Sequence, residues 1–202
     1  MNFSTSSSVR TARTTFHHAA LALAASTVLG LAACGGGGDD AGAGTASAAG
    51  GSGSGATGTL TFTGTNNSGR AGFVPPTDPT TCLAVKASFI QVNCLKPVAA
   101  VGGADNLMIT YSGALTAGSV VNLAAPGGSS QVEFTTTELS GTSVVTRFWG
   151  SDPVGTITLT AIDAKSVTFK LTGVSMKADA LSGGSISSGT ILADGTVTVN
   201  LK

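Results

Sequence analysis

The chain has 202 residues, with 10 Lys and Arg against 10 Asp and Glu, 29 glycines and few aromatic residues. This composition argues against a coiled coil or a protein of long surface helices and favours a β-rich or linker-bearing chain. From Cys34 onward there are 8 basic and 10 acidic residues, a formal charge of −2, which excludes the basic surface of a nucleic-acid-binding protein.

The first 33 residues have the layout of a secretory signal peptide. Residues 1–18 contain Arg10 and Arg13 and no acidic side chain, and residues 19–33 are a stretch of Ala, Leu, Val and small residues. A helix that crosses about 30 Å of hydrocarbon needs roughly 20 apolar residues, and glycines end this shorter run. We therefore predict a signal peptide over 1–33 rather than a membrane-spanning helix.

The end of this stretch, Leu31-Ala32-Ala33-Cys34, resembles the lipobox of bacterial lipoproteins, in which the cysteine is lipidated and becomes the new N-terminus. The resemblance covers only the leader and implies three acyl chains on Cys34, enough for a durable membrane anchor. Gly35 follows the cysteine where an aspartate would imply retention at the inner membrane, so the resemblance implies the outer membrane, on its periplasmic or its surface side. The alternative is an ordinary signal peptide with an incidental cysteine, which would leave a free thiol in an oxidising compartment.

After the cysteine, the chain divides into a linker and one domain. Residues 34–57 are Cys34 followed by Gly, Ala, Ser and Thr with two aspartates, a composition that has nothing to bury and predicts a flexible linker. Residues 58–202 are long enough for a single domain with a core. Their short alternating segments, separated by Gly, Pro, Asn and Asp, predict an antiparallel β-sandwich, with a β-barrel as the alternative.

Two segments show the alternation most simply. In residues 59–63, Leu60 and Phe62 alternate with threonines, and in residues 107–111 the apolar Leu107, Ile109 and Tyr111 occupy every second position. Period-two patterns of this kind are typical of antiparallel strands that are buried on one face. We expect both segments to be strands that contribute these apolar side chains to the core.

Between these two segments lie Cys82 and Cys94, an even pair that we expect to form a disulfide in an oxidising compartment. An uninterrupted strand would hold the two residues about 40 Å apart, whereas a disulfide needs Cα atoms within about 7 Å, so the chain must turn back between them. The apolar phase, which is odd through Leu83 and Phe89 and even from Ile90, predicts this turn near 86–88. The alternative is two buried thiols.

Two further strands are predicted over 131–137 and 142–149, joined near Ser140-Gly141. The second ends at Trp149, the only tryptophan, beside a polar turn. An aromatic ring in this position is typical of a sugar-binding platform, with Arg147 and Asp152 as hydrogen-bonding partners. The competing interpretation, that Trp149 closes the core, is the commoner one for a strand-end tryptophan.

Residues 156–171 predict a hairpin. Two sets of apolar residues occupy odd positions, Ile157, Leu159 and Ala161, then Val167, Phe169 and Leu171. To place both sets on one face, odd positions must pair with odd positions, which requires a turn of three or five residues around 163–165.

The C-terminus contains Asp194-Gly195, a pair that favours a two-residue hairpin turn. Such a turn would place Leu192 opposite Val197, and Val197, Val199 and Leu201 would form a closing strand. We therefore predict a second hairpin here.

The sequence offers little catalytic chemistry. Both histidines, His17 and His18, precede Cys34, so the mature chain would lack the Ser-His-Asp, Cys-His and usual zinc and haem arrangements, and no Ser-x-x-Lys motif occurs. Paired carboxylates could still serve a hydrolase, but the acids fit turn and surface positions. These acids are Asp105, Glu133, Glu138, Asp152, Asp163 and Asp194. Clustered acids could also hold calcium, yet no calcium-binding loop motif is present.

We therefore expect no catalytic residues, no metal and no cofactor. The favoured function is that of a non-enzymatic cell-envelope lipoprotein, held at the membrane by its lipid anchor, whose β-domain contacts an envelope protein or polysaccharide and no nucleic acid. The alternative is an envelope carbohydrate- or small-ligand-binding module centred on Trp149, and a carboxylate-based hydrolase is the third reading.

Overall fold

The computed structural model describes residues 55–179 and 186–202, all within the compact unit Ala49–Lys202. The predicted signal peptide, the lipidation site at Cys34 and nearly all of the predicted linker lie outside the described residues. The strands are β1 (Thr57–Thr63), β2 (Gly72–Phe73), β3 (Cys82–Lys86), β4 (Ile90–Val98), β5 (Gly103–Tyr111), β6 (Ser119–Asn122), β7 (Gln131–Ser140), β8 (Ser143–Ser151), β9 (Thr156–Ile162), β10 (Ser166–Ala178) and β11 (Thr190–Leu201), with a 3-10 turn, η1 (Ala99–Val101), after β4.

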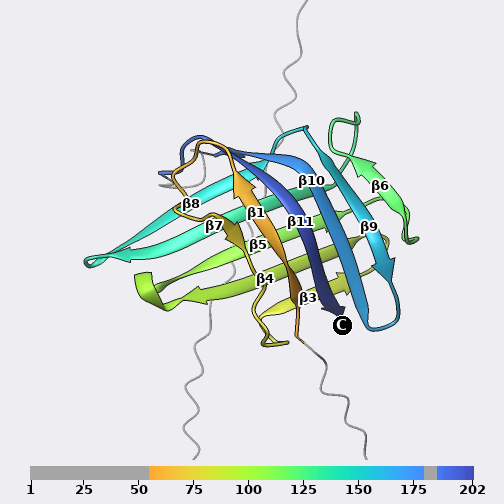
Figure 1. Cartoon of the computed structure of the whole chain (residues 1–202), viewed down its shortest axis with the longest axis horizontal. Coiled ribbons are helices and arrows are strands. Elements are labelled where there is room, and N and C mark those ends of the chain that lie inside the picture. Colours follow the sequence, from red (N-terminus) through yellow and green to blue (C-terminus); the bar gives the residue numbers. More distant parts are fainter. Residues whose placement is uncertain (1–54, 180–185) are drawn as a thin grey trace, which may run out of the picture. The chain divides into compact units, whose positions relative to one another are not determined.

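All these strands belong to one sheet, in the order β2-β1-β11-β3-β4-β5-β7-β8-β10-β9-β6. The sheet folds into two layers, and β1, β9, β10 and β11 lie across β4, β5, β7 and β8 (Figure 1). Two short pairings join the layers, the parallel contact of β11 with β3 and the antiparallel contact of β8 with β10, and β10 also pairs with β11. The predicted all-β fold is confirmed, in a sandwich or barrel-like arrangement.

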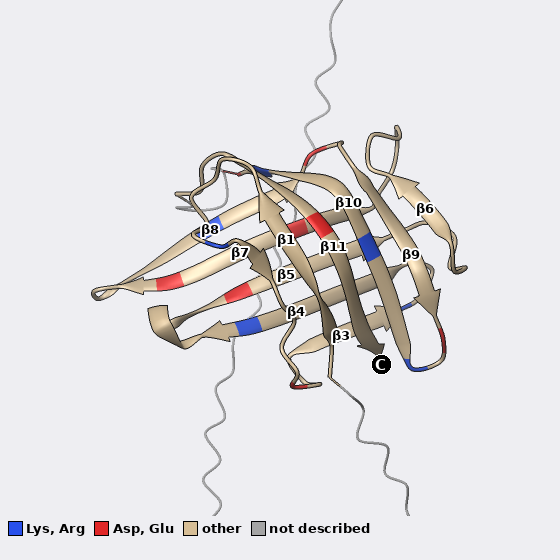
Figure 2. Cartoon of the chain, in the orientation of Figure 1, with Lys and Arg blue, Asp and Glu red and all other residues tan. Residues whose placement is uncertain are grey.

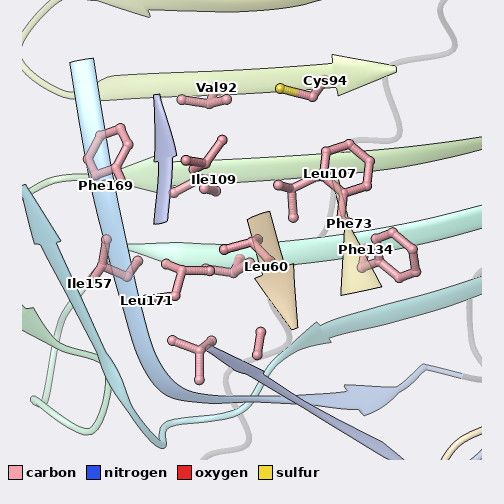
Figure 3. Packing of buried hydrophobic residues seen from close by; sticks show 14 of the residues in the cluster. Leu60, Phe73, Val92, Cys94, Leu107, Ile109, Phe134, Ile157, Phe169 and Leu171 are labelled. Atoms are coloured by element: carbon pink, nitrogen blue, oxygen red, sulfur yellow. The ribbon is translucent and has the colours of Figure 1, made fainter. Parts of the chain in front are cut away.

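The core lies between the layers and is built from every second residue of the strands (Figure 3). Phe134 of β7 is central: its ring centre lies 4.8 Å from that of Phe62, 6.2 Å from that of Phe73 and 6.3 Å from that of Trp149. These rings come from β1, β2, β7 and β8, so one aromatic cluster ties the two layers together. The predicted strands over 59–63 and 107–111 contribute their apolar residues to this core as expected.

The β7–β8 hairpin turns at Gly141 and Thr142 and is closed by the pair Ser140–Ser143, close to the predicted position. Gly141 has a φ of +64°, which glycine adopts without strain. This hairpin fixes which side chains of β7 and β8 face the core and which face outward.

Cys82 and Cys94 are joined by a disulfide and lie directly opposite each other on β3 and β4. The turn between the strands spans 87–89, which confirms the predicted turn, but the predicted phase change is wrong. Cys82 and Ala84 face the core in phase with Ile90 and Val92, whereas Val85 and Phe89 are exposed. A three-residue turn keeps even positions opposite even positions, so no slip is needed.

The hairpin of β9 and β10 follows the prediction only in part. Three residues separate the two strands, but the innermost pair is Ile162–Val167, which places an even position opposite an odd one. A β-bulge at Thr160 then shifts the register, and only beyond it does Leu159 face Phe169. The bulge, rather than the turn, brings the buried odd positions together, and Ala161 is exposed.

The predicted C-terminal hairpin is wrong, because Asp194 and Gly195 lie inside the continuous strand β11. Ile191, Ala193, Val197 and Val199 are all buried, so the alternation passes through the Asp-Gly pair without a break. The carboxylate of Asp194 accepts a hydrogen bond of 2.7 Å from the N–H of Gly173, at a bulge in β10. The closing strand is therefore present but pairs with β1, β10 and β3 instead of folding back on itself.

Candidate functional site

Trp149, the predicted centre of a ligand platform, is a core residue. Its side chain is fully buried beside Phe134, and its indole N–H donates a hydrogen bond of 3.4 Å to the carbonyl of Ser188. A ring without an exposed face cannot stack on a ligand, so the platform predicted at Trp149 is not formed. The competing interpretation, in which this tryptophan packs in the core, describes the structure.

The two predicted partners of Trp149 are also engaged elsewhere. The guanidinium of Arg147 donates a hydrogen bond of 2.8 Å to Glu138, and Asp152 forms an ion pair of 2.8 Å with Lys177. Arg147 and Asp152 thus bind different side chains and do not converge on one ligand position.

Arg147 belongs to a cluster of four charged residues at one end of the core. Arg70, from the loop between β1 and β2, binds Asp105 through Nε at 2.8 Å and Glu138 through Nη2 at 3.2 Å, and Glu138 also binds Arg147. Asp105 had been expected at a turn, but it lies within β5 and is only 3% exposed. A buried carboxylate requires a partner, and Arg70 supplies it.

The contacts within this cluster favour the charged forms of Arg70 and Glu138. The hydrogen bond from Arg147 lowers the pKa of Glu138, and the hydrogen bond to Asp105 raises the pKa of Arg70. A general acid needs a raised pKa so that it holds its proton near neutral pH, and Glu138 has the opposite shift. The cluster therefore suits a structural role, closing the end of the core, better than hydrolysis by paired carboxylates.

The structure reveals a second candidate on the outer side of the layer formed by β4, β5, β7 and β8, and we call it the neutral face. Asn93, Met108, Glu133 and Gly150 stand side by side across the four strands. The face comprises Gln91, Asn93 and Leu95 on β4, Asn106, Met108 and Thr110 on β5, Gln131, Glu133, Thr135 and Thr137 on β7, and Thr146, Phe148 and Gly150 on β8. Toward the β7–β8 turn the same side continues with the apolar residues Pro97, Ala104, Leu139 and Val144, of which Leu139 and Val144 are exposed. None of these residues is buried, and Glu133 alone among them is charged.

Charged residues are sparse on the strands as a whole (Figure 2). At the margin of the neutral face, Lys177 pairs with Asp152, so that cation is matched by an anion. Burial raises the pKa of Glu133, and this carboxylate has no ion pair within the described part of the chain. The neutral face therefore consists of amides, hydroxyls and a few apolar groups around one partly desolvated carboxyl.

Phe148 gives the neutral face an aromatic group. Its ring leans toward Gly150, where an added Cβ would lie 3.4 Å from a ring carbon. Because Gly150 has no side chain, the ring of Phe148 can occupy the space beside it, next to Glu133, which pairs with Gly150. An aromatic ring and a carboxyl thus lie together on adjacent strands.

A pocket of about 350 Å³ adjoins the neutral face at Thr110. It is lined by Ser88, Phe89, Thr110, Ser112 and Ser129. Phe89 belongs to the β3–β4 turn and is 40% exposed. The volume is near the lower end of the range for small-ligand pockets, and the lining repeats the combination of hydroxyls with one aromatic ring.

Sequence reasoning missed both the charged cluster and the neutral face. The alternation within each strand was visible, so the outward position of Thr135 or Phe148 could have been read from the strand. Which strands stand side by side depends on the sheet order, and that order decides that Asn93, Met108 and Glu133 form one row.

Comparison with protein-family models, with curated proteins and with solved structures finds no match to this chain. Within 55–179 and 186–202, no helix is long and apolar enough to span a membrane. The same residues contain no group of three or more His, Cys, Asp or Glu side chains placed to bind a metal ion.

Proposed function

We propose that this protein is a non-enzymatic lipoprotein of the bacterial cell envelope, anchored through Cys34, whose β-domain binds an envelope partner. The observation that carries the binding role is the neutral face, a broad outward surface with a single charged residue, on which every residue is at least partly exposed. No described strand packs against it, because the strands of the other layer lie on the core side. Amides and hydroxyls on a rigid sheet offer directional hydrogen bonds, and Glu133, whose pKa burial raises, has no second carboxylate or base beside it on the face.

The location of the protein rests on two features. Leu31-Ala32-Ala33-Cys34 ends a signal-peptide-like leader, and Cys82 and Cys94 form a disulfide. Disulfides persist in oxidising compartments and are rare in the cytosol. The disulfide therefore supports export, and the lipobox supports the outer membrane as the site of anchoring.

Fractionation of bacteria that express the full chain tests this proposal. The wild type is expected in the outer-membrane fraction, with a mature N-terminus at Cys34 that carries fatty acids by mass spectrometry. Cys34→Ser should move the protein to the soluble periplasmic fraction, because about 0.8 kcal/mol per buried CH₂ is lost with the acyl chains. The double variant Cys82→Ala/Cys94→Ala is the control: it removes the disulfide, keeps Cys34 and should leave the protein in the membrane.

A mature protein that still begins at Met1, or a Cys34→Ser variant that stays in the membrane, would contradict the anchor. Loss of membrane association in the Cys82→Ala/Cys94→Ala control would likewise contradict an anchor that depends on Cys34 alone.

A further inference from the structure

The neutral face has the chemistry of a surface for hydroxyl-rich ligands. Side-chain amides alternate with hydroxyls along its rows: Gln91 lies beside Thr110, which lies beside Gln131, and Asn106 lies beside Thr135. An amide offers two donors and an acceptor, and a hydroxyl can act as either, so both suit sugar hydroxyls. Gln91 and Asn93 are exposed and accessible to a ligand.

The same face lacks the groups that other polymers require. Lys177, next to Gly150 in the row of Glu133, is a cation beside the face and is paired with Asp152. A polyanion would therefore meet no unpaired Lys or Arg at the face and would be repelled by Glu133, and a polycation would find only that one carboxylate. Protein interfaces are typically enriched in aromatic residues and arginine at their centre, whereas this face has Phe148 as its one aromatic residue, no arginine, and four amides and four threonines. The charge distribution therefore matches an uncharged ligand.

Apolar groups are interspersed among the polar ones. The ring of Phe148 leans over Gly150, and Met108 stands in the same row as Glu133 and Gly150. A sugar ring has an apolar C–H face and a rim of hydroxyls, so an aromatic ring beside amides and a carboxyl complements both parts. A carboxylate can accept hydrogen bonds from two neighbouring hydroxyls, which is a role for Glu133 that needs no cationic partner.

We propose that the neutral face binds an uncharged polysaccharide, with Phe148 against a sugar ring and Asn93 hydrogen-bonded to its hydroxyls. The proposal rests on the proposed function, since it names the partner of that same surface. The pocket beside Thr110 extends the binding surface past the end of β5, where Phe89 and the serines provide a position for a further sugar unit.

Affinity electrophoresis of the full chain, purified in detergent, tests this proposal. Native gels contain a neutral polymer: dextran, hydroxyethylcellulose or galactomannan. Migration of the wild type should be retarded by at least one of them. Dextran sulfate and diethylaminoethyl-dextran share the dextran backbone but carry charge, and we expect weaker binding to both than to dextran where dextran binds.

Variants then locate the binding surface. Phe148→Ala should raise the dissociation constant about tenfold and Asn93→Ala about fivefold, because each removes one principal contact. The matched control is Thr61→Ala, an exposed position on β1 in the other layer, which should bind as the wild type does. Asn93 is exposed, so its variant keeps the test valid even if Phe148→Ala fails to fold.

Absence of retardation by all three neutral polymers would overturn the polysaccharide proposal and leave a protein as the envelope partner. Wild-type affinity in both Asn93→Ala and Phe148→Ala, equal weakening in Thr61→Ala, or stronger binding to a charged dextran would overturn it as well. These outcomes are independent of the Cys34 fractionation: an anchored protein that binds no glycan refutes only this inference, and a glycan-binding protein without lipid refutes only the anchor.

Discussion

Two glutamates on one strand show how strongly the side of the sheet determines the behaviour of a residue. Glu138 faces inward on β7, where Arg147 lowers its pKa, whereas Glu133 faces outward and burial raises its pKa. The sequence places both on or near a strand but does not distinguish them, because Arg70 reaches Glu138 from a loop that is distant along the chain. The direction in which the pKa of a carboxylate shifts therefore depends on partners that are distant along the chain.

Replacement of Glu138 by Gln should destabilise the domain at pH 7 by about 1–3 kcal/mol, because Arg147 and Arg70 would lose a charged acceptor near the core. A folded-state pKa below the ordinary value stabilises the folded state above that value and loses this effect as the pH falls through the folded pKa. The difference from the wild type should therefore shrink as the pH falls from 7 to below about 4.5, the ordinary pKa. Urea unfolding at several pH values measures it.

Glu133→Gln, on the same strand, is the matched control, and its expected effect on stability has the opposite sign. Burial disfavours its charged form, so the glutamine variant should unfold at a slightly higher temperature at pH 7 and lose this advantage as the pH falls through the raised pKa of Glu133. Equal effects of the two variants at pH 7 would contradict the distinct environments described for the inner and outer sides of β7.

At the scale of elements, a continuous hydrophobic alternation outweighed a strong turn signal. Asp194-Gly195 is a preferred hairpin pair, but β11 needs an inward residue every second position from Ile191 to Val199, and a glycine fulfils that requirement without a side chain. The alternation could be read from the sequence, and it correctly predicts β1, β5 and the β7–β8 hairpin. The bulges in β9 and β10 could not be read, because they serve cross-strand pairing.

The alternation of side chains along a strand also decides which aromatic residue is available at the candidate site. Trp149 and Phe148 are consecutive on β8, so they face opposite sides of the sheet, and the burial of one makes the other available. Tryptophan is the stronger signal for sugar binding, yet its size also makes it valuable to the core, where it packs on Phe134. Sequence reasoning could therefore identify the strand that carries the aromatic contact proposed here, but it chose the residue on the opposite side of the sheet.

Gly195 gives an element-scale prediction. Its φ is +136°, and an added Cβ would lie 2.2 Å from the carbonyl oxygen of Thr59 on β1. Gly195→Ala should destabilise the domain by about 2–5 kcal/mol, because the backbone strain adds to the forced separation of β1 from β11. Chemical denaturation monitored by the fluorescence of Trp149 measures this loss.

Gly173→Ala is the control for the backbone term alone. Gly173 also has a positive φ, +56°, but an added Cβ would meet nothing within 4 Å. Its variant should lose only about 1–2 kcal/mol. Similar losses in the two alanine variants would mean that β1 does not approach β11 as closely at Gly195 as the structure places it.

For the whole molecule, the closure of the sheet depends on short contacts. β3 meets β11 through only the pairs Asn200–Leu83 and Leu201–Ala84, and β8 meets β10 through three pairs. β3 is therefore held mainly by β4, to which the disulfide links it at Cys82 and Cys94. A covalent link at this position supports one of the two junctions that join the layers.

The disulfide should accordingly matter more than the short loop it closes would suggest. In the Cys34→Ser background, which leaves Cys82 and Cys94 as the only cysteines, reduction of the bond between them should lower the free energy of unfolding by about 3 kcal/mol through chain entropy alone. For a domain of this size, that corresponds to a melting temperature lower by roughly 6–12 °C.

Loosening of the β3–β11 junction would add to this loss of stability. It would also speed backbone amide exchange in β3 and in the last residues of β11, while the buried middle of β7 stays protected. Differential scanning calorimetry and hydrogen exchange, each with and without reductant, measure the two effects, and the Cys82→Ala/Cys94→Ala double variant should reproduce the reduced state. Unchanged stability on reduction would contradict the role of the bond, whereas a stability loss with exchange raised equally in all strands would contradict the local effect on the junction.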